Sequence, residues 1–183
     1  IFVLHAVYLN VPAEDSFITF RFARHLANGH GIVWNVGEPP VEGYTNFLWL
    51  LAAALIIQLN LDVALATQIL GVAASLVALG VTALFARQVF ELPRRFVLLA
   101  VGLLAVSGPF ATWAASSMET NLFALLVLAA CFWFARWVKR QRQRDLIAAQ
   151  LALLTATLTR PEGFLVFSVL AALGFLLTLG ARE

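Results

Sequence analysis

Charged side chains are scarce in this sequence: Asp, Glu, Lys and Arg make up 12% of its 183 residues, while 62% of the residues are hydrophobic. Soluble domains carry about twice this share of charge. The mean hydropathy of +0.90 therefore excludes an ordinary water-soluble domain and indicates a membrane protein.

Cysteine is nearly absent as well. The single cysteine, Cys131, lies in an apolar run, which excludes a disulfide framework and a thiolate metal site. Residues 1–11 lack the charged segment and small-residue cleavage site of a signal peptide. We interpret them as the last turns of a membrane-spanning helix, which predicts that the sequence is part of a longer chain.

The excess of basic residues is small and local. The net charge is +2 and the isoelectric point is about 9.2. A cluster at the end of one apolar run accounts for most of the excess, which predicts a cytoplasmic loop rather than a nucleic-acid surface. The cluster consists of Arg136, Lys139, Arg140, Arg142 and Arg144, and Arg87, Arg94 and Arg95 form a weaker group of the same kind.

Long uncharged runs dominate the chain, and crossing a bilayer takes about 20 apolar residues. They predict an all-α fold: a polytopic transmembrane helix bundle that forms one domain over residues 1–183, in the cytoplasmic (inner) membrane. The predicted membrane helices are 63–87, 95–113, 118–138, 145–159 and 163–180. The run 45–59 is short for a crossing. We favour a helix in the outer leaflet, and an ordinary tilted crossing is the alternative.

With the basic cluster in the cytoplasm, the alternating predicted crossings place three polar segments on the extracytoplasmic face. They are the loop 12–43, Glu119, and the turn 159–163 with Arg160 and Glu162. Polar groups gathered at one membrane surface are costly and indicate a functional site.

The loop 12–43 begins with a predicted amphipathic helix that starts at Asp15 and ends at Gly29. One arc is apolar and the opposite arc polar, as in helices that lie along a membrane interface with arginines directed at headgroups or an anionic ligand. Phe17 falls on the polar arc and does not fit. The apolar arc contains Ile18, Phe22, Ala23, Leu26 and Ala27, and the polar arc contains Arg21, Arg24, His25 and Asn28.

Residue type alone leaves the roles of the polar residues open. Glu14 and Asp15 fit capping of the predicted helix, or a general base with a pKa adjusted at the membrane surface. His30 fits a ligand or proton carrier, although a lone loop histidine is more often neither. Arg160 fits a phosphate held by paired hydrogen bonds, or a side chain that merely extends to the interface.

Three segments together resemble one family. They are "EDSFITFRFARHLANGHGIVWNVGEPPVEGYTNFLW" (14–49), "SSMETNLFALL" (116–126) and "LTRPEGFLVF" (158–167). They are similar to the GT-C superfamily of integral-membrane glycosyltransferases, in the branch that contains the mycobacterial terminal arabinofuranosyltransferase. The resemblance implies an inverting enzyme that takes a sugar from a polyprenyl phosphate and gives it to an extracytoplasmic glycan, lipid or protein.

The resemblance also implies roles for individual residues. Asp15 matches the second acid of the family's acidic pair, the general base. Glu14 would position the acceptor or a metal, although this pair is Glu-Asp where Asp-Asp is commoner. Arg160 matches an arginine that faces the donor phosphate. Glu119 would bind the acceptor, unless it only caps the following helix. Tyr44 and Asn46 would reach sugar hydroxyls, unless Asn46 is a simple helix cap.

The expected partners are the lipid bilayer, the lipid-phosphate sugar and the acceptor, with no nucleic acid; a divalent metal ion is left open. The alternative is a non-catalytic transmembrane subunit that packs its apolar faces against a larger membrane complex. A transporter fits less well, because the apolar runs hold no charged residue that could line a path.

Overall fold

The computed structural model describes residues 1–9 and 12–180. The prediction of an all-α fold is confirmed: 75% of the described residues are helical, and they contain no strand. Residues Phe2–Tyr8 form α1, and residues 10 and 11 lie outside the described part; that residues 1–11 end a membrane-spanning helix stays a prediction.

The helices follow the predicted segments closely. The interfacial candidate is α2 (Glu14–Ala27), and the short apolar run forms α3 (Phe47–Gln58). The remaining helices are α4 (Val63–Gln88), α5 (Arg94–Ala105), α6 (Gly108–Ala114), α7 (Thr120–Arg140), α8 (Gln143–Thr159) and α9 (Gly163–Gly180).

Two helices, α4 and α7, are long and apolar enough to cross a membrane. The pair α5 and α6 raises this number to three if it forms one bent span. The predicted crossing over 95–113 is formed by two helices, α5 and α6, which meet at a bend of 60°. Ser107, the N-cap of α6, has an extended backbone, and Gly108 and Pro109 follow it. Proline is favoured in the first turn of a helix and disrupts a helix interior, so Pro109 starts a new helix rather than continuing α5.

The other apolar helices are shorter. At about 1.5 Å per residue, the 12 residues of α3 extend about 18 Å, well short of a hydrocarbon core of about 30 Å. Helices α8 and α9 also fall below the length of the candidate spans. Whether these three helices cross, enter or border a membrane stays a prediction.

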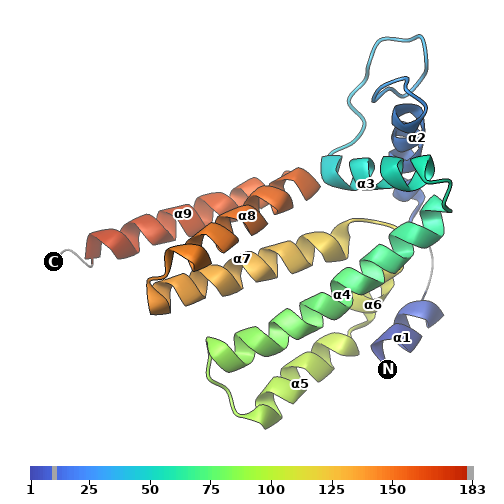
Figure 1. Ribbon diagram of the computed structural model, residues 1–183. Helices are drawn as coiled ribbons and strands as arrows, with labels where there is room; N and C mark the ends of the chain where they lie inside the picture. The colour runs from blue at the N-terminus through green and yellow to red at the C-terminus, as the bar shows by residue number, and fades with distance from the viewer. Residues whose placement is uncertain (10–11, 181–183) are drawn as a thin grey trace.

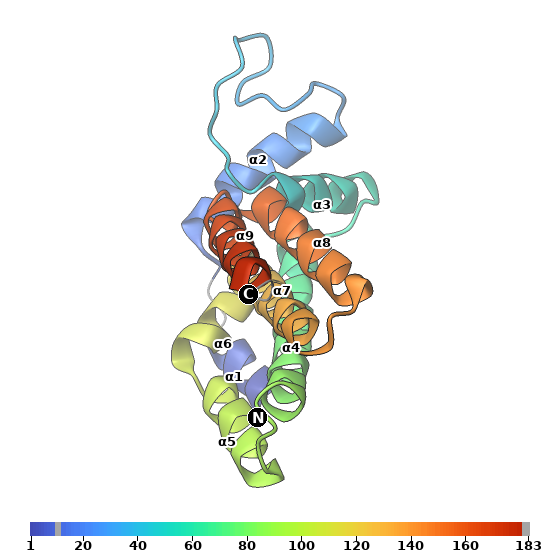
Figure 2. The ribbon, with the colours of Figure 1, turned by 90° about the vertical axis from the view of Figure 1, so that its left-hand side faces the viewer.

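The helices α4, α7, α8 and α9 form the body of the molecule, with α7 packed against both α4 and α8 (Figure 1). Helices α2 and α3 and the loop between them cover one end of this body (Figures 1 and 2). The beginnings of α4, α7 and α9 and the end of α8 lie at that end. The three polar segments of the sequence therefore meet beside α2 and α3.

Helix α2 packs on α3 through a small apolar core, but its buried face differs from the predicted arc. Phe20, Phe22 and Ala23 are buried against α3, whereas Ile18 is 39% exposed. Ser16 and Thr19 are buried in its place. Their hydroxyls are hydrogen-bonded to Ala13 O and to Asn46, which offsets the cost of burying polar groups. The buried face of α2 therefore includes hydrogen-bonded polar residues, which a hydropathy pattern assigns to the exposed face.

The basic cluster lies at the opposite end of α7. Arg136 lies 3.7 Å from Asp145, donates to Gln88 of α4 at 3.0 Å, and covers the ring of Trp133. Asp145 is completely buried. Arg136 thus joins α4, α7 and α8, in addition to any part that it plays in topology.

Candidate functional site

The site is built around the segment 115–119, which joins α6 to α7. The backbone N–H of Ala13 donates to Ser116 O at 2.9 Å, and the Trp49 indole N–H donates to Ser117 O at 3.0 Å. The Ser117 hydroxyl donates to Ala64 O at 3.2 Å. Three helices therefore fix the short segment that ends at Glu119.

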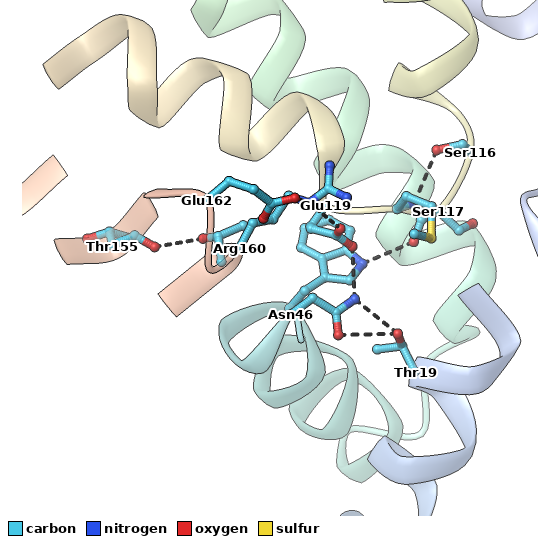
Figure 3. A network of polar contacts seen from close by, with 11 residues as sticks. Thr19, Asn46, Ser116, Ser117, Glu119, Thr155, Arg160 and Glu162 are labelled. Carbon is cyan, nitrogen blue, oxygen red and sulfur yellow. Dashed lines mark hydrogen bonds and ion pairs between the residues drawn. The ribbon is translucent and has the colours of Figure 1, made fainter. Parts of the chain in front are cut away.

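A buried hydrogen-bond network follows from this placement (Figure 3). The Asn46 amide donates to Glu119 Oε2 at 2.8 Å and to Thr19 Oγ1 at 3.0 Å. Glu119 Oε1 lies 3.4 Å from Arg160 Nε. Glu119 is only 2% exposed and Asn46 only 5%. A carboxylate buried to this extent is stable only with a cation and hydrogen-bond donors beside it, and the network supplies both.

Arg160 is positioned by the turn between α8 and α9. Its backbone N–H donates to Ala156 O at 2.8 Å, and its carbonyl accepts from Gly163 N at 2.9 Å. A Cβ at Gly163 would collide with the backbone of Ala156 and Thr157, so only glycine allows the chain to return so closely. Glu162 lies 3.9 Å from Arg160 Nε on the exposed side of the same turn.

A cavity of about 320 Å³ opens beside this network. Its walls come from α2, from the start of α3, from the segment before α7 and from the turn after α8. Two carboxylates and one guanidinium line it, so its lining carries a net charge of about −1 in the ionised state. The lining includes Asp15, Thr19, Tyr44, Asn46, Glu119 and Arg160.

Five of the seven candidate residues lie at this cavity: Asp15, Tyr44, Asn46, Glu119 and Arg160. Asp15 is exposed at the start of α2, and the Tyr44 ring packs edge-on against Phe22 with 5.2 Å between ring centroids. The five residues are spread along the chain from position 15 to position 160.

Two candidates lie elsewhere. Glu14 is exposed and is not among the residues that line the cavity. His30 is exposed in the loop after α2, where its ring lies 6.4 Å from that of His25. Neither residue is placed to contact a molecule inside the cavity.

The simple capping interpretations do not hold. Ala13 occupies the N-cap of α2, so Glu14 and Asp15 do not cap it; they lie in its first turn, where they complement the helix dipole. Asn46 and Glu119 do occupy the N-caps of α3 and α7, but neither side chain caps its helix. Both side chains instead bond across to other elements.

Sequence reasoning missed Thr19 and Trp49. A signal for Thr19 was present, because it follows Asp15 by four residues and therefore lies on the same side of a helix. Trp49 gave no such signal, since its partner is a backbone carbonyl 68 residues away.

The part of the chain that the structure describes holds no group of three or more His, Cys, Asp or Glu side chains arranged to bind a metal ion.

In comparisons with known proteins, no family model, no curated protein and no solved structure matches this chain. The glycosyltransferase resemblance thus stays a prediction, and function has to be argued from the geometry of the site.

Proposed function

We propose that this protein is a membrane glycosyltransferase that moves a sugar from a polyprenyl phosphate to an extracytoplasmic acceptor. One observation carries the proposal: the acidic, amide and guanidinium groups of four segments of the chain line a single cavity of about 320 Å³. Such a cavity fits a sugar, because hydroxyl groups pair with carboxylate and amide side chains.

In this proposal Asp15 is the general base. It takes the proton from an acceptor hydroxyl, and that oxygen forms a bond to the anomeric carbon of the donor. The bond between this carbon and the phosphate oxygen breaks on the opposite side, so the configuration inverts and polyprenyl phosphate leaves. The exposure of Asp15 at the rim supports this role, since the acceptor approaches from water.

Arg160 stabilises the charge that develops on the leaving phosphate. Its ion pair with Glu119 uses Nε, and a guanidinium has five N–H donors, so others remain for phosphate oxygens. Glu119 and Asn46 fix the orientation of this arginine. Because the lining is net negative, the phosphate is expected at the Arg160 end of the cavity and the acceptor hydroxyl at the Asp15 end.

The test is transfer by the full-length protein in proteoliposomes, with a radiolabelled polyprenyl-phosphate sugar and a mixture of envelope glycans. We expect Asp15→Asn to lower the transfer rate by at least a hundredfold, because general-base catalysis contributes about 10²–10⁴. Glu42→Gln is the matched control, since Glu42 is an exposed carboxylate of the same loop outside the cavity lining. Equal rates for wild type and Asp15→Asn would refute the role of Asp15.

The second candidate is a non-catalytic membrane subunit. The observation that favours a subunit is the Glu119–Arg160 ion pair. It joins the start of α7 to the turn after α8, and this structural role needs no substrate. A subunit predicts that the protein co-purifies with fixed partners and that Asp15→Asn changes nothing measurable.

A further inference from the structure

A second cavity lies on the other side of α2. It measures about 660 Å³ and is bounded by α2 and by the corner where α3 leads into α4. Residues of a helix turn by about 100° each, which puts Arg21 and Arg24 of this cavity opposite Asp15 and Thr19. Helix α2 therefore separates two cavities.

The charge of this second cavity is opposite to that of the first. Arg21, Arg24 and His25 line it together with one acid, Asp62, which gives a net charge of about +1 with a neutral histidine. Asp62 is already engaged, because its Oδ1 accepts from the Leu65 N–H at 2.8 Å as the N-cap of α4. Its negative charge is thus partly offset by that helix end.

The cationic side is held in position before any ligand arrives. Arg21 Nε donates to Trp34 O at 2.9 Å, its guanidinium also bonds Asn35, and the guanidinium carbon lies 4.1 Å from the centre of the Trp34 ring. His25 Nδ1 donates to Val33 O at 2.8 Å, since a carbonyl can only accept, which leaves Nε2 for another partner. These bonds fix the loop and the two side chains together.

Arg24 is different, because it is exposed and its side chain makes no hydrogen bond or ion pair within residues 1–9 and 12–180. A free guanidinium beside a fixed guanidinium is an arrangement suited to phosphate, whose oxygens accept paired N–H donors. Apart from Asp62, the opposite wall is apolar, with Ile57 and Val63, and Leu61 is 55% exposed at its edge. The exposed Phe17, which did not fit the polar arc, also borders this cavity.

We propose that the cavity between α2 and the α3–α4 corner is a phosphate-binding site, separate from the cavity at Asp15. The phosphate group of an anionic lipid headgroup and free phosphate share the chemistry that this site recognises, and the apolar edge at Phe17 and Leu61 fits the start of a lipid chain. The site goes beyond the proposed transfer reaction, and its occupancy can be measured without any turnover.

The experiment measures binding to the purified full-length protein in neutral detergent by isothermal titration calorimetry. The probes are inorganic phosphate, short-chain dihexanoyl phosphatidylglycerol, and dihexanoylglycerol, which has the same chains and no phosphate. We expect saturable binding of at least one phosphate probe and none of dihexanoylglycerol. Binding of phosphatidylglycerol alone identifies a lipid headgroup as the ligand, and equal binding of inorganic phosphate shows that the phosphate group is sufficient.

The decisive variant is Arg24→Gln, which changes an exposed side chain that has no hydrogen bond or ion pair to lose among the described residues. We expect it to weaken phosphate binding at least tenfold, and Arg24→Lys to weaken it less, because the charge remains without the paired donors. The control is Arg94→Gln, an exposed arginine at the start of α5, with unchanged binding. The proposal is overturned if no phosphate probe binds, if dihexanoylglycerol binds equally well, or if Arg24→Gln binds as the wild type does.

Discussion

Replacing Arg160 by glutamine tests whether the buried network depends on its ion pair. The side chain of Glu119 is 3% exposed and that of Arg160 is 33% exposed, with 3.4 Å between Arg160 Nε and Glu119 Oε1. Asn46 donates the other hydrogen bond to this carboxylate. In Arg160→Gln the carboxylate stays buried with one amide donor and no cation.

The magnitude follows from this geometry. Removing one partner of a fully buried ion pair costs about 3–5 kcal/mol. Because Arg160 is one-third exposed, water screens part of the interaction, and we expect Arg160→Gln to lower the unfolding free energy by about 2 kcal/mol. Glu119→Gln removes the charge and retains a carbonyl for Asn46, so about 1 kcal/mol is expected.

Unfolding in mixed micelles of neutral detergent and dodecyl sulfate, followed by circular dichroism, measures these losses. The double variant should lose less than the sum of the single variants by about 1 kcal/mol, because neither half of the pair is then left alone. Arg94→Gln serves as the exposed control. The reasoning is refuted if Arg160→Gln is as stable as this control, or if the two single losses add without coupling.

Two further predictions concern packing and charge. A Cβ at Gly71 would collide with Ala114 O, whereas a Cβ at Gly80 would contact no atom of the described residues. In the same unfolding assay, Gly71→Ala should therefore destabilise the protein by about 1–3 kcal/mol, and the control Gly80→Ala should not. The hydrogen bond and charge of Lys139, 2.8 Å away, hold the pKa of the Glu91 carboxyl below its usual value. This pair therefore stabilises the fold at neutral pH, and its contribution is lost as the pH falls below the usual glutamate range. Lys139→Met should raise the pKa of Glu91 toward the usual value in a titration followed by NMR, and an unchanged pKa would contradict the assignment.

The long helices could be predicted because their signal is local. The runs 63–86 and 120–135 contain no charged residue, and α4 and α7 occupy them. Ser107, Gly108 and Pro109 mark the place of the bend between α5 and α6, but its angle depends on packing. The buried face of α2 could not be predicted from hydropathy, since Thr19 is buried by a partner 27 residues away.

The candidate site was predictable to a similar degree. The charged residues Asp15, Glu119 and Arg160 stand out against apolar neighbours, and the alternation of crossings placed them on one side. The hydrogen bonds that orient them were not predictable, because Asn46 and Glu119 look like helix caps in the sequence and bond to each other in the structure. Residue type at a helix start does not determine where the side chain points.

The central claim is that a lipid-phosphate sugar binds in the cavity beside Asp15. The most direct test is photolabelling of the full-length protein with a polyprenyl-phosphate sugar that carries a diazirine on the sugar ring, followed by mass spectrometry of the labelled peptides. We predict adducts within residues 43–46, 118–119 and 160, suppressed by excess unlabelled donor. Adducts that excess donor does not suppress, or that fall only on the apolar helices away from this cavity, would contradict the claim.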